Sequence, residues 1–358
     1  MLLIVCLGHY KAPIPYMVFF TSVHVASFFF LSGLLFDMNK NRAFGVFFRK
    51  KVFSLLIPYI SLSLLFLPFE PLVYNVNLPL SVGPHYVLKE ISNLSWLQNP
   101  KDGLTMLILH LEGIFIEGLS SEITGPLWFL WALFVVEMVL WVILRIASNR
   151  IWVVAMALLL MCVGWKFNDL QIYLPLNLNT ITSAASISCL GHLCQPAVKY
   201  IQKVNVLYTA IAVMGLFSLY WAGLNFNQSP DLFNNSLGPN LFWYGITICC
   251  GLWLYMLVFN YIDQFYGGGK MHYAMSWVAK NSIVILAVHY WSMRVFRTAC
   301  YYMGIGDSQY TPYGLICFGC ITCAIAVPLF NHYLPIFVGR KKKVNETTDS
   351  YICSKSQG

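Results

Sequence analysis

Uninterrupted apolar segments recur along almost the whole chain, and they constrain its fold more than any other feature. Each has roughly the 17–25 residues that a helix needs to cross a bilayer core of about 30 Å. Because lipid offers the backbone no hydrogen-bond partners, only bundled helices or a closed barrel can cross it. The segments are continuous rather than alternating, so they predict helices. The expected fold class is therefore all-α, a polytopic integral membrane helical bundle.

The composition excludes a soluble domain and argues against a nucleic-acid partner. Of the 358 residues, 58% are hydrophobic and only 10% are charged, whereas a soluble domain carries about 25% charged residues. The net charge is +8, but the basic residues cluster in short loops without interleaved aromatics. That distribution is typical of the excess of lysine and arginine in cytoplasmic loops. We expect membrane lipids, and no nucleic acid, around this chain.

We expect about ten transmembrane helices, over residues 1–10, 16–36, 53–69, 126–144, 151–166, 172–198, 206–224, 241–262, 272–291 and 312–337. The apolar segment 104–118 is short and holds His110 and Glu112, so we expect it not to cross. The strongly basic loops then fall on one side and the acidic ones on the other. This predicts a multi-pass protein of the inner or plasma membrane with a cytoplasmic C-terminus.

The expected domain organisation is one transmembrane domain over residues 1–338 and a tail over residues 339–358. The tail is basic and then polar, which is typical of a disordered cytoplasmic segment.

Two histidines lie in the first two apolar segments, where ionisable groups are costly and mark functional sites. His9 ends the first segment, and His24 lies about two turns into the second. Only the short sequence YKAPIP joins the segments, so we expect the two helices to pack together and the imidazoles to approach. Imidazole exchanges protons near neutral pH, which suits general acid–base catalysis on a hydroxyl. The alternative is that each histidine hydrogen-bonds a neighbouring helix, our interpretation for His192 and His332.

Two groups of basic residues stand at opposite faces of the expected bundle. Arg49, Lys50 and Lys51 lie at the cytoplasmic mouth before the third segment. They are either membrane anchors or a site for the phosphates of a cytosolic donor. Arg294 and Arg297 lie on the outer side, where they either snorkel to the interface or bind an anionic acceptor or a lipid-linked phosphate.

We expect no metal site. Most of the 11 cysteines lie inside apolar segments, and Cys317, Cys320 and Cys323 follow one helical stripe. No closed tetrahedral set of ligands accompanies them, and no carboxylate or cysteine stands at ligand spacing from either histidine.

Five motifs in order resemble those of the acyltransferase family 3 membrane proteins, in particular the branch named for fucose 4-O-acetylase and related acetyltransferases. The motifs are LLIVCLGH, HVASFFFLSGLLF, FFRKKVFSLLIPY, GPLWFLWALF and AKNSIVILAVHY. The resemblance implies transfer of an acyl group, usually acetyl from acetyl-CoA, to a hydroxyl of a carbohydrate or similar acceptor.

The resemblance also implies roles for individual residues. His9 falls on the catalytic histidine of the family, and His24 on the histidine of the second-helix motif. Lys51 falls on the first basic position of the third motif; the last motif supplies Asn281, Ser282 and His289. The chain departs from the pattern at Ser54, at Val25 with Ala26, and at Ala279.

The beginning of the chain departs from the resemblance most. Only eight residues precede His9, and at 1.5 Å per residue they cover about 12 Å of the membrane. Family members usually have half a helix more at this point. We expect a truncated first helix, from either a late start or a genuine truncation.

These features predict an integral-membrane O-acyltransferase. Acyl-CoA would dock at Arg49, Lys50 and Lys51, and His9 would deprotonate the acceptor hydroxyl while His24 orients or relays. A covalent acyl-histidine is an alternative. A carbohydrate or lipid-linked sugar would enter from the outer half, toward substrate-side candidates Asn281, Ser282, His289, Arg294, Arg297 and Trp128. The rival hypotheses are a glycan or lipid transporter, which predicts inverted repeats, and a membrane scaffold.

Overall fold

The computed structural model describes residues 2–10, 17–70, 99–119, 122–201, 206–266, 269–305 and 310–340. Within these ranges the chain is helical and has no strand beyond one isolated bridge between Asp231 and Ser236. The predicted all-α polytopic bundle is confirmed. The predictions for residues 11–16, and for all but the first two residues of the tail, lie outside the described residues.

Seven helical segments of the described chain are long and apolar enough to cross a membrane. They are Met17–Leu34, Phe44–Phe69, Thr124–Ile146, Arg150–Asp169, Leu207–Asn227, Leu241–Gln264 and Thr311–Tyr333. Two more long helices, α11 (Leu178–Ile201) and α15 (Ser282–Tyr302), are not among them because they carry more polar residues. Helix α8 (Pro100–Phe115) has 16 residues and is also outside this set.

The first segments are broken into short helices. They comprise α1 (Leu2–His9), α2 (Met17–Thr21), α3 (His24–Leu34), α4 (Phe44–Lys51), a π-helical turn (Val52–Leu56) and α5 (Ile57–Phe66). The later helices are longer: α9 (Trp128–Ile146), α10 (Arg150–Asp169), α12 (Val206–Asn227), α13 (Leu241–Tyr266) and α16 (Thr311–Tyr333). Irregular backbone at membrane depth is tolerated only where protein or a cavity surrounds it, so the broken segments belong in the interior.

The single crossing predicted over residues 272–291 is wrong in its bounds. The chain forms α14 (Lys270–Lys280) and then α15, with Asn281 between them at φ −109° and ψ 17°. An asparagine side chain competes with the helix for backbone hydrogen bonds, and here it donates to the carbonyl of Trp277 at 2.8 Å.

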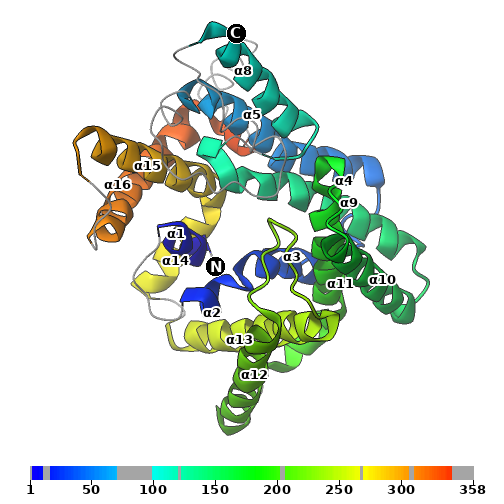
Figure 1. The fold of residues 1–358 in the computed structure, drawn as a ribbon. Coiled ribbons are helices and arrows are strands. Elements are labelled where there is room, and N and C mark those ends of the chain that lie inside the picture. Colours follow the sequence, from blue (N-terminus) through cyan, green and yellow to red (C-terminus); the bar gives the residue numbers. More distant parts are fainter. Residues whose placement is uncertain are drawn as a thin grey trace, which may run out of the picture.

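Figure 1 shows α1, α2 and α3 in the middle of the molecule, with other helices around them. The surrounding helices pack in sequential pairs, α10 with α11, α12 with α13, and α15 with α16. Close packing of α3 against α11 depends on two glycines. A Cβ on Gly33 would lie 1.8 Å from the carbonyl oxygen of Ser188, and one on Gly191 would lie 2.0 Å from that of Phe30. Small residues of this kind let membrane helices approach closely.

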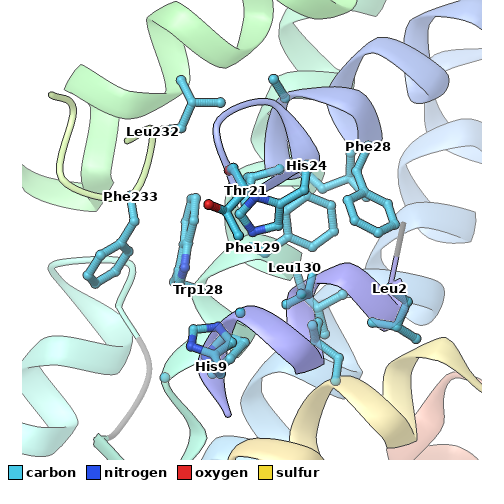
Figure 2. Close-up of a pocket in the computed structure, with 18 of the residues that line it drawn as sticks. Leu2, His9, Thr21, His24, Phe28, Trp128, Phe129, Leu130, Leu232 and Phe233 are labelled. Atoms are coloured by element: carbon cyan, nitrogen blue, oxygen red, sulfur yellow. The ribbon is translucent and has the colours of Figure 1, made fainter. Parts of the chain in front are cut away.

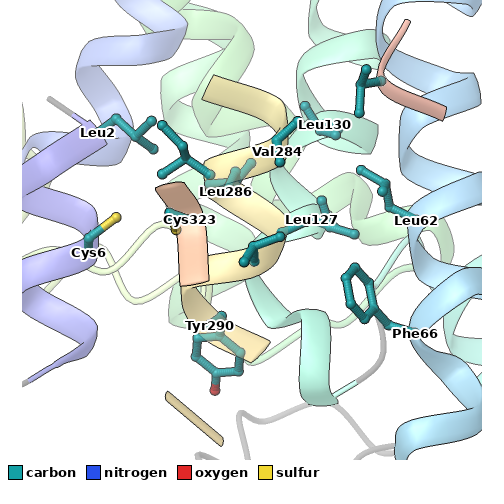
Figure 3. Packing of buried hydrophobic residues seen from close by; sticks show 14 of the residues in the cluster. Leu2, Cys6, Leu62, Phe66, Leu127, Leu130, Val284, Leu286, Tyr290 and Cys323 are labelled. Atoms are coloured by element: carbon teal, nitrogen blue, oxygen red, sulfur yellow. The ribbon is translucent and has the colours of Figure 1, made fainter. Parts of the chain in front are cut away.

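A buried apolar cluster joins α1 to the C-terminal helices (Figure 3). Its members include Cys6 of α1, Cys323 of α16, and Val284 and Leu286 of α15, packed with Leu62, Phe66, Leu127 and Leu130. This cluster packs α1 against α15. Because His9 is the last residue of α1, the packing determines where His9 lies.

Candidate functional site

A cavity of about 770 Å³ lies between α1, α3, α9, α15 and the segment that connects α12 to α13. Its volume is in the range of small-molecule sites, about 300–1,000 Å³. His9, His24, Trp128 and Ser282 all line it, and Figure 2 shows His9, His24 and Trp128 on its wall. The structure thus brings together four of the residues predicted from sequence. Asn281, His289, Arg294, Arg297 and the basic cluster do not line this cavity.

The imidazole of His9 lies against residues of α15. Its ring centroid is 5.5 Å from that of His289 and 5.1 Å from that of Tyr290. Next to His9, the Tyr10 hydroxyl donates to the carbonyl of His289 at 3.3 Å. Residues of α15 therefore determine the position of His9. The imidazole nearest to His9 is that of His289, whereas His24 lies elsewhere on the same cavity wall.

His289 is buried and has a defined tautomer. Its Nδ1 lies 2.8 Å from the carbonyl of Ile285 and donates to it, because a carbonyl oxygen only accepts. The proton-free Nε2 has no partner among the described residues. A neutral acceptor nitrogen therefore stands beside His9.

His24 is the first residue of α3, directly after a break in the second apolar segment. Helix α2 ends at Thr21, and Val23 has φ −124° and ψ 4°. The His24 Nδ1 donates to the carbonyl of Thr21, which leaves Nε2 as the nitrogen that can accept a proton.

Two tyrosine hydroxyls donate hydrogen bonds to the carbonyl oxygens that the break leaves without a partner in the helix. The Tyr220 hydroxyl of α12 donates to the carbonyl of Phe19 at 2.7 Å. The Tyr255 hydroxyl of α13 donates to the carbonyl of Phe20 at 2.6 Å. A buried carbonyl without a partner costs about 1–3 kcal/mol, so these hydroxyls stabilise the break that places His24. Sequence analysis did not single out either tyrosine.

Arg294 lies behind the cavity wall. Its guanidinium donates to the Tyr290 hydroxyl at 3.2 Å and lies 5.4 Å from the centroid of that ring. Tyr290 itself lines the cavity beside His9. The arginine, buried at 2% exposure, therefore reaches the site through the tyrosine. Arg297 is half-buried on the next turn of α15.

Lys51 is engaged inside the protein. Its ammonium forms an ion pair with Glu137 of α9, whose carboxylate is only 7% exposed. Leu55, one turn after Lys51, and Leu133, one turn before Glu137, line the cavity, so this ion pair lies next to the cavity wall. Arg49 and Lys50 are exposed. A π-helical turn follows Lys51, an irregularity that occurs frequently at functional sites.

Asn281 has a structural environment in the described chain. Its side-chain oxygen accepts from Asn331 at 2.9 Å and from Arg340 at 3.1 Å. Arg340 also donates to the side chain of Asn331 at 2.6 Å. These hydrogen bonds stabilise the break between α14 and α15. The adjacent residue, Ser282, lines the cavity.

The connection from α12 to α13 supplies a wall of the cavity that sequence analysis missed. We call residues 228–240 the α12–α13 hairpin and residues 229–234 its tip. All six residues of the tip line the cavity. The Phe233 ring packs against the Trp128 indole, with centroids 5.3 Å apart. The signal for this segment was the run of polar residues NQSPDLFNNS between two apolar segments.

Within the described ranges, no group of three or more histidine, cysteine, aspartate or glutamate side chains is placed to hold a metal ion.

A helical membrane protein with an interior cavity lined by histidines is an arrangement suited to group transfer within the membrane. The family model for the acyltransferase domain of acyltransferase family 3 matches residues 1–331. The chain therefore belongs to acyltransferase family 3 and is an integral-membrane acyltransferase. No curated protein matches the chain. No solved structure matches it either.

Proposed function

We propose that this acyltransferase is an O-acetyltransferase of the fucose 4-O-acetylase-related branch. It would move the acetyl group of acetyl-CoA to a hydroxyl of a cell-surface or extracellular polysaccharide or its sugar precursor. The protein would lie in the inner or plasma membrane with its C-terminus in the cytoplasm. The single observation that carries the proposal is His9 on the wall of the cavity, held beside His289 and Tyr290.

His9 acts as a general base in this proposal. It takes the proton of the acceptor hydroxyl while the oxygen attacks the thioester carbonyl carbon. The C–O bond forms, the C–S bond breaks, and the CoA thiolate receives the proton from the imidazolium. His24 lines the same cavity and orients the hydroxyl or relays its proton. An acyl-histidine intermediate at His9 is the covalent variant of this reaction.

The donor would enter at the end of the cavity marked by Leu55 and Leu133. The exposed side chains of Arg49 and Lys50 stand two turns or less before Leu55 on the same helical segment, where they would bind the phosphates of acyl-CoA. Lys51 is paired with Glu137, so it would hold the helix that carries Arg49 and Lys50 against α9 rather than bind a phosphate itself.

Removal of the imidazole of His9 tests the reaction. His9→Ala should lower acceptor-dependent release of CoA thiol by roughly 10²–10⁴-fold, the usual contribution of a general base. The assay uses membranes that contain equal amounts of folded protein, acetyl-CoA and a mixture of glycan acceptors. His192→Ala is the control, because His192 lies near Arg150 in a separate pocket. Full activity of His9→Ala would refute the proposal.

The donor end has its own test. The double variant Arg49→Ala and Lys50→Ala should raise the KM for acetyl-CoA about tenfold at unchanged kcat, because charged hydrogen bonds are worth about 1.5–3 kcal/mol. The control is Lys166→Ala, an exposed lysine paired with Asp169. An unchanged KM for acetyl-CoA would refute the hypothesis that Arg49 and Lys50 bind the donor.

A further inference from the structure

The α12–α13 hairpin is held against the bundle at its base. Asn227 at its base is fully buried; its amide donates to the carbonyl of Leu237 and accepts from the backbone of Asn240, both at 2.8 Å. From α10, Trp165 donates to the carbonyl of Gly238 at 3.2 Å. A loop fixed in this way can present its tip in one geometry, as specific recognition requires.

The polar atoms that the tip offers are hydrogen-bond acceptors. The amide nitrogen of Asn234 donates to the Asp231 carboxylate at 2.7 Å, which fixes the orientation of the amide. The side-chain oxygen of Asn234 is then buried without a partner among the described residues. Ser22 donates to the carbonyl of Val18, so the 2.6 Å contact between Ser22 and Ser229 uses the proton of Ser229. An acceptor-rich wall fits a ligand that brings hydroxyl donors.

The charge of the cavity points the same way. Its wall, as far as the structure describes it, contains no lysine or arginine, and Asp231 is its one carboxylate. The buried Arg294 lies behind Tyr290. A carboxylate or phosphate on the acceptor would therefore meet the like charge of Asp231 with no cation in the wall to offset it. Like charges brought together in a binding site cost several kcal/mol.

Trp128 adds an apolar platform between the tip and His9. The indole is 6% exposed and lines the cavity. Figure 2 shows Phe233 on one side of it and the cavity with His24 on the other. The Phe233 ring packs against the indole at an interplanar angle of 47°, and the edge of the indole that borders the cavity is where the apolar face of a sugar ring would pack.

We propose that the tip of the α12–α13 hairpin is the acceptor subsite and that it selects uncharged pyranose sugars over anionic ones. The ring would pack on Trp128, and its hydroxyls would donate to the Asn234 side-chain oxygen and to the Asp231 carboxylate. One further hydroxyl would thus lie toward His9 across the same cavity. This inference rests on the proposed function, since it names the acceptor of that reaction.

The test compares matched pairs of acceptors with one enzyme. The probes are the methyl glycosides of glucose, galactose and mannose and the corresponding methyl uronides, each assayed for acetyl transfer with acetyl-CoA. The wild type should prefer the neutral member by at least about tenfold in kcat/KM, which corresponds to about 1.4 kcal/mol. Asp231→Asn keeps the side-chain shape and should reduce that preference about fivefold or more. A ratio measured within one enzyme is independent of how much protein folds.

Two further variants complete the design. Asn234→Ala should raise the KM for the neutral glycoside about three- to tenfold at an unchanged KM for acetyl-CoA. Asn225→Ala, at an exposed position of α12, and Asp169→Asn, in an exposed ion pair on α10, are the matched controls and should change neither value.

The outcomes separate this inference from the proposed function. Equal or better transfer to the uronides, or a preference that Asp231→Asn leaves unchanged, overturns the subsite. Hydrolysis of acetyl-CoA that depends on His9, with no transfer to any glycoside, also overturns it. Absence of any CoA release that depends on His9 instead refutes the proposed function.

Discussion

Two of the helix breaks in the described chain differ in how their free polar groups are satisfied. At Ser22 and Val23, between α2 and α3, hydroxyl groups from two distant helices donate to the free carbonyls. At Asn281, between α14 and α15, the hydrogen bonds come from the side chain of Asn281 itself, which donates to Trp277, and from Arg340, which donates to Asn281. The first break borders the cavity with His24 at its edge, whereas Asn281 lies outside the cavity.

The difference shows what an irregular backbone does in each place. The first break turns a histidine into the start of a helix, with its ring nitrogen fixed by Thr21. It therefore fixes the orientation of His24 on the cavity wall, and it depends on α12 and α13 to do so. The second break is stabilised by Arg340. The hydrogen bonds of Asn331 with Asn281 and Arg340 join this break to α16. We expect substitutions at the first break to change catalysis and those at the second to change stability.

The largest effect is expected for His24→Ala. The variant should lose roughly 10²-fold or more in kcat, within the range for loss of an acid–base group, while the KM for acetyl-CoA stays the same. Single-turnover acetyl transfer in membranes measures it. His332→Ala, an exposed histidine of α16, is the control. A kcat within threefold of wild type would reduce His24 to a structural residue.

The next effect is expected for the double variant Tyr220→Phe and Tyr255→Phe. Loss of both hydroxyls leaves the carbonyls of Phe19 and Phe20 without donors, which costs about 1–3 kcal/mol each. The break should relax toward a continuous helix that carries His24 away from the cavity, with about a tenfold loss in kcat. Acetyl transfer and thermal unfolding in detergent measure both effects.

Tyr244→Phe is the matched control for these tyrosines. Tyr244 is buried on α13, but its hydroxyl has no partner in the described chain. Its removal should therefore leave both kcat and the melting temperature unchanged. A similar loss of kcat in Tyr244→Phe would show that the phenylalanine substitutions act through general packing.

A smaller and different effect is expected for Arg340→Ala. The change removes the donors to Asn281 and Asn331, and it should lower the free energy of unfolding by about 1–3 kcal/mol. The kcat per folded molecule should stay the same. Arg340→Lys keeps the charge but not the forked donor geometry, so it should recover only part of the loss. A large fall in kcat would contradict the structural role of the second break.

The smallest effect is expected for Ser22→Ala. Ser22 links the first break to the hairpin through Ser229 at 2.6 Å, and loss of one such bond is worth about 1 kcal/mol. We expect a change of about two- to fivefold in the KM for the acceptor. Ser218→Ala is the control, because Ser218 makes the same local bond to the carbonyl four residues earlier and is exposed. Equal effects of the two variants would separate Ser22 from acceptor binding.

Much of the site was predictable from residues that are unusual in apolar segments. His9 and His24 were found in this way, and the structure places both on one cavity together with the substrate-side candidate Trp128. The approach of His9 to His289 across about 280 residues was not predictable, because it depends on how α1 packs on α15. For Lys51 the sequence indicated either a membrane anchor or a phosphate site, but a carboxylate 86 residues later in the chain pairs with it.

Tyr220 and Tyr255 carried no local signal of their importance. A tyrosine in an apolar helix is ordinary, and its role appears only where its hydroxyl meets a particular carbonyl. The same holds for Asn234, which lines the cavity and whose side-chain oxygen is buried without a partner among the described residues.

The sequence by itself determined that this chain is an α-helical membrane protein, since hydrophobicity adds up along a segment regardless of what the segment packs against. The motif order and the intramembrane histidines also determined its class of chemistry. Only the tertiary structure decided which histidine lies beside His9, which hydroxyls hold the first break, and which loop lines the cavity. Each of these depends on a contact between residues about 200 or more positions apart, which meet only after the helices have packed.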